Sequence, residues 1–342
     1  MSAIDLSRLL DEVSPESPCG KNLEYDSAFR ELELAAAGKP ERRTGDSVVA
    51  AEPPDWRDVR ERSLELLRRT KDLRAAVHLA RSLLETDGMV GFRDGLAFFR
   101  QNLERYWDSI HPQLDSEDGH DPTLRVNTIS ALGDWNEMVR SVREQPLVVS
   151  RRLGRFSLRD IEIADGTLPK PAAEGVEFAE SSTIEAAFTD ADGAELQATF
   201  DGLRGAIEEV GRITAFVTVK VGATRSADLS RLTSTLMSAE RALAPHLSQN
   251  GDSDGAANLA GGSDTRDQRR AGAGEITSRD EVIRFLDKAC DYFRKNEPSS
   301  PVPLLLQRAK RLVSKDFLEI VKDLAPGGVS EVRGIGGLDS EE

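Results

Sequence analysis

The chain has few cysteines and aromatic residues, fewer basic than acidic residues, and no long apolar runs. Its 342 residues include 45 lysines and arginines against 60 aspartates and glutamates, which gives a net charge of −15. Duplex nucleic acids and anionic membrane surfaces both select basic protein faces, so the charge disfavours both as partners. No segment approaches the ~20 consecutive apolar residues of a membrane span. We therefore expect a cytoplasmic protein without membrane insertion.

The two cysteines, Cys19 and Cys290, stand near opposite ends of the chain. Neither has a second cysteine or a histidine at metal-ligand spacing, which predicts two reduced thiols rather than a zinc site. Cys19 has only Lys21 nearby to lower its pKa, so a structural thiol is favoured over a nucleophile. Residues 1–14 have acidic residues and no basic start, which does not indicate a signal peptide.

Recognisable catalytic motifs are also missing: the sequence has no GxxxxGK[ST], HExxH or GxSxG. The best metal-binding candidate is the acidic stretch 115–121 with His111 nearby, but its spacing does not fit a calcium loop. We interpret this stretch as a solvated acidic turn that caps the next helix. His78 is interpreted as a packed or surface side chain. We therefore predict no enzyme, no cofactor and no metal.

Abundant Ala, Leu, Arg and Glu predict an all-α fold, organised as an antiparallel helical array. One helix is expected to begin at Asp55 and a second at Asp72, because both aspartates can cap. Gly88 is expected to end the second helix, and a third follows over 89–107. Residues 124–142 are predicted to be helical again. Short connections make neighbouring helices antiparallel, but no fixed repeat period is present.

The remaining stretches are more varied. Residues 14–55 are rich in Pro, Gly and Ser and are predicted as a loop-rich segment with a turn or two of helix. The pattern over 147–163 is consistent with a small hairpin. A capping box at 182–185 predicts a helix start. Two longer helices are expected over 194–221 and 227–247.

Residues 248–274 contain six glycines and a single large aliphatic residue, so they are predicted to be a flexible linker. A compact module follows, with a capping box at 278–281 and a basic stripe around Arg308. This stripe is either a docking face or a solvated helix face, and the sequence favours neither. The predicted organisation is a loop-rich N-terminal helical domain over 1–164, a middle helical region over 165–247, the linker, a C-terminal helical oligomerisation module over 275–326 and a tail over 327–342.

Several runs resemble a known family. They are SPCGKNLEYD (17–26), residues 51–96, LERYWDSIHPQLD (103–115), DPTLRVNTISAL (121–132) and LGRFSLRDIEIA (153–164). These runs resemble the ImpA N-terminal domain of TssA proteins from bacterial type VI secretion systems, and residues 276–326 resemble the C-terminal region of the shorter TssA class. Within this resemblance we take four residues as signature or core positions: Trp56, Leu73, Trp107 and Leu124.

The resemblance implies a structural role without catalytic residues. It implies a homo-oligomeric ring at the baseplate or sheath end that helps to nucleate the contractile tail. The implied partners are further copies of the chain and baseplate, sheath and tail-tube components, with the membrane complex as a further candidate. Its implied location is the cytoplasmic side of the apparatus at the inner membrane.

A module of about fifty residues buries its apolar residues poorly alone. We therefore expect some of them to form a subunit interface that closes into a ring. The expected interface residues are Val302, Leu304, Leu305, Arg308, Leu312, Phe317 and Ile320. One alternative is a monomeric or small-oligomer adaptor that bridges two secretion-system components through its helical modules. Another is an enzyme with an unrecognised site near Cys19 or 115–121.

Overall fold

The structure is a computed structural model that describes residues 6–44, 47–171, 178–247, 283–288, 290 and 302–312. These residues are mostly helical. The chain divides into two compact units, Met1–Asn258 and Leu259–Glu342. The helical fold class predicted from the composition is confirmed at this level, and the finer domain boundaries stay predictions.

The first unit begins with short elements, as its loop-rich sequence predicts. A 3-10 turn η1 (Ser7–Leu10) is followed by α1 (Ser27–Ala37), the strands β1 (Arg42–Thr44) and β2 (Ser47–Val49), and α2 (Trp56–Arg69). The Asp55 side chain caps α2, as expected. The antiparallel β1–β2 ribbon was not expected, because three-residue strands give no readable alternation.

Helix α3 (Leu73–Arg105) is two helices joined at Gly88, whose φ of 69° only glycine adopts easily. The two halves fold back on each other: a Cβ placed on Gly95 would lie 2.8 Å from the Cα of Ala80. The Asp72 side chain accepts a hydrogen bond from the backbone N–H of Arg74 and caps the first half. The predicted helix start, the break at Gly88 and the antiparallel pair are therefore confirmed.

Residues 124–142 are mostly helical, as predicted, but the structure divides them into four short elements. The structure has α4 (Thr123–Ser130), a 3-10 turn η2 (Ala131–Gly133), a π-helical turn η3 (Trp135–Val139) and α5 (Arg140–Glu144). Asp134 is extended and its side chain accepts from the N–H groups of Asn136 and Glu137, so it starts a new helix. A Cβ on Gly133 would lie 2.9 Å from Asp228 O, so the chain passes close to a neighbouring segment there.

The predicted hairpin over 147–163 is confirmed only in its first part. Strands β3 (Pro146–Ser150) and β4 (Gly154–Ser157) pair antiparallel, but α6 (Leu158–Ala164) follows at once. Ser157 and Asp160 form a capping box, in which each side chain hydrogen-bonds to the other's backbone N–H. This box turns the apolar run after Phe156 into a helix.

The described residues 181–247 at the end of the first unit are mostly helical. They form α7 (Ser181–Asp190), α8 (Gly193–Val221), a 3-10 turn η4 (Ala223–Arg225) and α9 (Ser230–Leu247). The helix predicted over 194–221 is confirmed, including its β-branched end. The helix at 182–185 is present, but it starts at Ser181 after Glu180 and no side chain caps it, so the predicted capping box is wrong.

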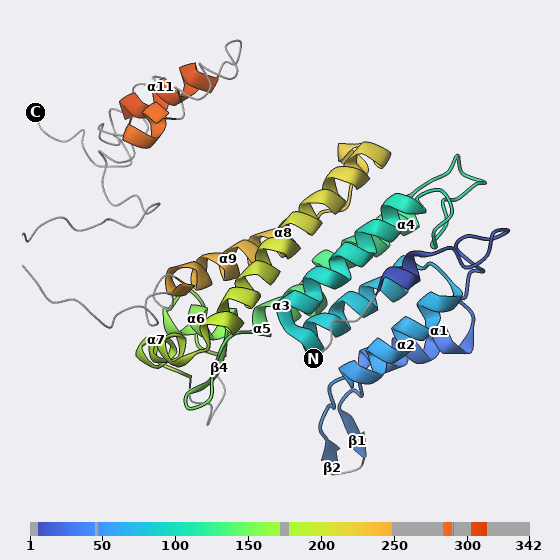
Figure 1. The fold of residues 1–342 in the computed structure, drawn as a ribbon, viewed down its shortest axis with the longest axis horizontal. Coiled ribbons are helices and arrows are strands. Elements are labelled where there is room, and N and C mark those ends of the chain that lie inside the picture. The colour runs from blue at the N-terminus through green and yellow to red at the C-terminus, as the bar shows by residue number, and fades with distance from the viewer. Residues whose placement is uncertain are drawn as a thin grey trace, which may run out of the picture. The chain divides into compact units, whose positions relative to one another are not determined.

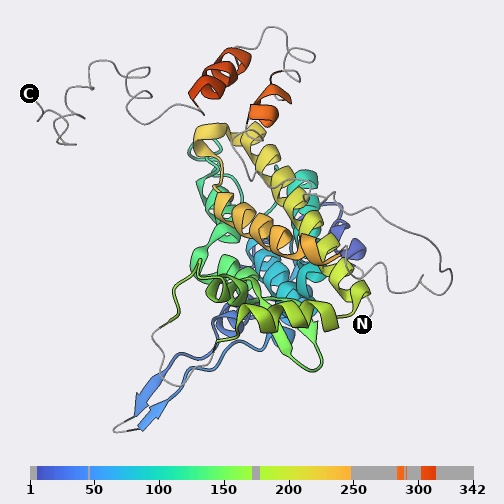
Figure 2. The same cartoon turned by 90° about the vertical axis from the view of Figure 1, so that its left-hand side faces the viewer.

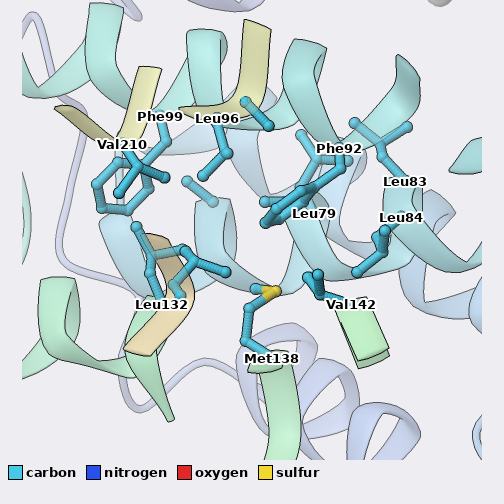
Figure 3. Packing of buried hydrophobic residues seen from close by; sticks show 14 of the residues in the cluster. Leu79, Leu83, Leu84, Phe92, Leu96, Phe99, Leu132, Met138, Val142 and Val210 are labelled. Atoms are coloured by element: carbon cyan, nitrogen blue, oxygen red, sulfur yellow. The ribbon is translucent and has the colours of Figure 1, made fainter. Parts of the chain in front are cut away.

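The core of the first unit lies between the two halves of α3, α8 and the short helices that follow α4. Figure 3 shows Leu79 and Phe92 from the two halves of α3 close together, with Met138 and Val142 beside them and Val210 of α8 next to Phe99. Helix α8 approaches α3 closely, since a Cβ on Gly202 would lie 2.7 Å from the backbone carbon of Met89. The elements of this unit are followed by colour and label in Figure 1.

The second unit is described for the helical residues 283–288 and 290 and for α11 (Val302–Leu312). Its helices are tied by Lys310, whose Nζ lies 2.7 Å from a carboxylate oxygen of Asp287. Cys290 is buried, with its Sγ 3.8 Å from Pro303 O. The predicted linker 248–274, the capping box at 278–281 and the tail lie outside the described residues.

Candidate functional site

The SPCG segment is held against the start of α3 and the loop after it. The backbone N–H of Lys71 donates to Cys19 O at 2.8 Å, and His111 Nε2 lies 3.1 Å from Gly20 O. The N–H of His111 donates in turn to Lys71 O at 3.0 Å. Gly20 has φ +68°, and a Cβ there would lie 2.3 Å from Arg69 O. Three segments that are distant in sequence therefore meet through backbone contacts that require this glycine.

Buried polar side chains extend this junction to the N-terminal turn η1. The Lys71 ammonium is buried and donates to Leu9 O at 2.5 Å, and the Tyr106 hydroxyl donates to Leu10 O at 2.7 Å. Burial lowers the pKa of Lys71. Each of these contacts satisfies a carbonyl near the turn end, so η1 is fixed to the body of the unit.

Arg125 is the largest fully buried side chain of the described residues. Its guanidinium donates to Ile110 O at 2.7 Å, to Pro112 O at 2.9 and 3.0 Å, and to Trp107 O. It also lies over the Trp107 ring, 4.8 Å from the centroid. Burial lowers the pKa of Arg125 to about 10, so the group stays charged near neutral pH. Arg125 thus ties α4 to the loop after α3.

Three of the four predicted signature residues lie in or against the core. Leu73 is fully buried and Trp107 is buried at the Arg125 site. Trp56 is half-buried, and the Arg81 guanidinium stacks over its ring at 4.8 Å. The signature side chains are therefore part of the packing between α2, α3 and the loop after α3.

Leu124 is the exception, since 65% of it is exposed and it is not a core residue. On α4 the buried side chains are Arg125 and Ile129, one helical turn apart. Leu124 precedes Arg125 by one residue and so lies about 100° around the helix, on the solvent side. Leu124 faces outward because the inward position of the helix is occupied by Arg125, whose guanidinium is hydrogen-bonded to backbone carbonyls.

Two carboxylates of the stretch 115–121 accept hydrogen bonds from nearby backbone N–H groups. Asp115 Oδ1 accepts from the N–H of Glu117 at 2.9 Å, and Asp121 Oδ2 accepts from the N–H of Thr123 at 3.1 Å. Hydrogen bonds from Thr123 hold the pKa of Asp121 below its usual range. Among the described residues, no three His, Cys, Asp or Glu side chains are grouped as they would be around a metal ion.

The two remaining candidates for chemistry are packed. Cys19 is buried with its Sγ 3.2 Å from Ser109 Oγ, and burial raises the pKa of its thiol, which makes it a poor nucleophile. His78 is half-buried, and burial together with the Arg81 charge lowers its pKa to about 4. Its imidazole is therefore neutral near neutral pH, as expected for a packed histidine.

The expected interface residues of the second unit are only partly described. Val302 and Leu312 are half-buried, Arg308 is exposed, and Leu305 is 65% exposed. The side chain of Leu304 and all of Phe317 and Ile320 lie outside the described residues. The structure adds Phe285, which the sequence analysis did not select and which is 44% exposed.

Arg125 and Lys71 were also missed. Their partners are backbone carbonyls, which leave no complementary residue type in the sequence. The only available signal is that Arg125 follows an apolar residue and precedes Val126, and many exposed arginines have the same neighbours. A buried arginine of this kind is therefore found only from the fold.

The comparisons with known proteins agree with this architecture. The family described as ImpA, N-terminal, type VI secretion system, matches residues 10–134. The solved N-terminal domain, including the conserved ImpA_N region, of the TssA component from Burkholderia cenocepacia has a TM-score of 0.59 at 24% identity, covering 73% of this chain and 96% of that one. At this identity the likeness shows the fold alone. The first unit is thus a helical domain of the ImpA N-terminal class.

The similarity extends over the whole chain. The type VI secretion system component TssA1 of Pseudomonas aeruginosa is 40% identical over 352 residues, covering 99% of this chain and 100% of that protein. The chain belongs to the TssA family of the type VI secretion system, and the resemblance seen in the sequence is confirmed.

Proposed function

We propose that this chain is a non-enzymatic assembly component of a type VI secretion system, of the short TssA class. It forms a homo-oligomeric ring at the baseplate or sheath end and helps to nucleate the contractile tail. The observation that carries the proposal is the similarity to TssA1, which spans both proteins almost from end to end. That range includes residues 275–326, the module to which we assign ring formation.

The described part of the second unit supports this assignment. Lys310 and Asp287 link its two helical segments, while Leu305 and Phe285 expose 65% and 44% of their surface. Large apolar side chains that a small unit leaves exposed are stabilised when a subunit interface covers them. The interface then comprises the exposed face of α11 together with Phe317 and Ile320.

The proposed partners are baseplate, sheath and tail-tube components and the membrane complex, and the proposed location is the cytoplasmic side of the apparatus. Among the described residues, no helix combines the length and the apolar character needed to cross a bilayer. Attachment to the apparatus would then go through protein contacts.

Light scattering on the full chain tests the ring. The variants Leu305→Asp and Leu124→Asp form a matched pair, because both leucines are 65% exposed and lie in different units. We expect a large discrete oligomer that Leu305→Asp reduces to small species and Leu124→Asp leaves intact. A chain ending at Leu247 should also be small. A full-length chain that is monomeric, or an oligomer that survives truncation, would contradict the proposal.

The adaptor alternative has one observation in its favour. A surface groove of ≈ 750 Å³ lies beside the first turn of α2, lined by residues that include Trp56, Arg57, Arg60 and Glu85. Burial raises the pKa of Glu85, so a ligand that supplies a positive charge there would be favoured. If the native protein is a monomer that forms a one-to-one complex lost on Glu85→Gln, the adaptor function replaces the ring.

A further inference from the structure

The β1–β2 ribbon projects from the first unit as an arm, which we define as residues 39–52. Figures 1 and 2, at right angles to each other, both show the two strands extending beyond the helices. Residues 39–43 and 49–53 are all exposed. The two strands form a sheet of their own, so each has one edge without a strand partner among the described residues.

The base of the arm is built as a defined ribbon. The N–H groups of Lys39 and Glu52 each donate to the other's carbonyl at 2.9 Å, and their side chains form an ion pair at 2.7 Å. Gly38, with φ +64°, makes the turn into the arm, and a Cβ there would lie 2.6 Å from Glu52 O. The strands then pair in register, with Arg42 opposite Val49.

A two-stranded ribbon with no core beneath it is only marginally stable in water, and three or more strands are needed for independent stability. The side chains that the structure describes in the arm, at 39–43 and 49–52, are exposed and so gain little packing from the helices. Additional strands therefore have to come from outside the fold.

The two edges of the arm differ in charge, and the difference favours one of them for pairing with another strand. The β1 edge carries Arg42 and Arg43 after Glu41, and charged side chains of this kind protect an edge against pairing. The β2 edge continues as Ser-Val-Val-Ala-Ala over 47–51, with no charge and no proline. Val49 on this edge is 53% exposed. The open edge is therefore β2.

We propose that the β2 edge of the arm pairs antiparallel with the β2 edge of a second copy of this chain. The result is a four-stranded sheet across a two-fold axis, with both uncharged strands in the middle and both β1 strands outside. An isologous contact of this kind is self-complementary. Pairing through β1 would instead place Arg42 and Arg43 against the same residues of the other copy.

The charge distribution also favours a second copy. Within 39–52 the three basic residues, Lys39, Arg42 and Arg43, balance the three acidic ones, Glu41, Asp46 and Glu52, whereas the whole chain carries −15. Two acidic chains repel each other at most surfaces. A neutral arm that extends beyond the helices allows them to make contact with less repulsion.

Two short strands bury far less than the ~1,600 Å² of a standard interface, so the contact is weak between free chains. Inside an assembly it becomes intramolecular and is strengthened by the effective concentration of neighbouring arms. The inference does not depend on the proposed ring, because the arm and the second unit are tested by different variants.

Cysteine crosslinking of the full chain tests the edge. Val49→Cys and Arg42→Cys lie directly opposite each other in the ribbon, so they test pairing at the β2 edge and the β1 edge at the same distance from the base of the arm. Both native cysteines are buried, and the unmodified chain serves as background. With a short bismaleimide we expect Val49→Cys to give crosslinked dimer as the main product and Arg42→Cys to give little. Equal crosslinking of both, or none at Val49→Cys, would overturn the proposal.

A second measurement detects pairing without a crosslinker. Amide hydrogen exchange of residues 47–52 should slow as the concentration of the full chain rises. Val49→Lys should abolish this dependence, because it places a charge on the open edge, while Arg42→Lys should retain it. The thermal midpoint of the helical body should not change in either variant, since the arm does not contribute to the core. Exchange that is independent of concentration in the unmodified chain would contradict self-pairing.

Discussion

Replacing Arg125 with methionine tests whether its buried guanidinium holds the loop after α3. Methionine can fill much of the space but donates no hydrogen bond. The change leaves the carbonyls of Trp107, Ile110 and Pro112 buried without a donor. Each buried unsatisfied group costs about 1–3 kcal/mol, while removing the buried charge recovers part of this. We expect a loss of roughly 4 kcal/mol in the free energy of unfolding, similar to breaking a buried charged pair.

Equilibrium unfolding in urea measures this loss. The midpoint should fall while the slope of the free energy against urea stays constant, since the surface exposed on unfolding is unchanged. Arg125→Lys should lose more than half as much, because an ammonium cannot reach three carbonyls in the plane of a guanidinium. The control is Arg231→Met, at an exposed position of α9, for which we expect a change within about 0.5 kcal/mol. A loss below about 1 kcal/mol for Arg125→Met would refute the reasoning.

Two further predictions concern packing and protonation. Gly202→Ala should destabilise the first unit by about 1–3 kcal/mol, because its Cβ would meet the Met89 backbone at 2.7 Å. The control in the same urea assay is Gly211→Ala, whose Cβ would have no atom within 4 Å, and it should be neutral or stabilising by up to about 1 kcal/mol. If both variants lost the same free energy of unfolding, the close approach of Gly202 to Met89 would be contradicted. The pKa of His78 is lowered to about 4, so the unfolded chain binds a proton that the folded chain does not, and stability should fall as the pH drops from about 6.5 to 4. For this half-buried side chain we expect the free energy of unfolding to fall by about 2 kcal/mol over this pH range. His78→Gln should remove this part of the pH dependence, measured by thermal unfolding. An unchanged pH profile in the variant would refute the assignment to His78.

The sequence predicted the long elements because their signals are local. Gly88 ends a helix through its own backbone preference, and the helix at 194–221 has enough apolar periodicity to outweigh its β-branched end. The helical stretch expected over 124–142 is divided because the Asp134 side chain caps a new helix within it. The sequence analysis did not predict the capping box at Ser157, which ends strand β4 and starts helix α6 within the stretch predicted as a hairpin. In both cases a short polar side chain decides the local structure.

The buried polar junction could not be predicted, for a different reason. Its side chains, Arg125 and Lys71, bind carbonyls that the fold brings together from separate segments. A carbonyl is the same on every residue, so the sequence contains no pattern for the partner. Leu124 illustrates the consequence, since we selected it from the family resemblance as a signature or core position, whereas the structure exposes Leu124 and buries Arg125 beside it.

These observations separate residues that stabilise the body from residues available for contacts. In the first unit the buried cations Lys71 and Arg125 are satisfied within the fold by backbone carbonyls, so they do not need a partner. The exposed apolar side chains Val49 and Leu305 lie on small elements, a two-stranded ribbon and a short helix. Such elements gain most from an added strand or helix. Assembly contacts are therefore expected at β2 and α11, and substitutions there should change the oligomeric state while the unfolding of the helical body stays the same.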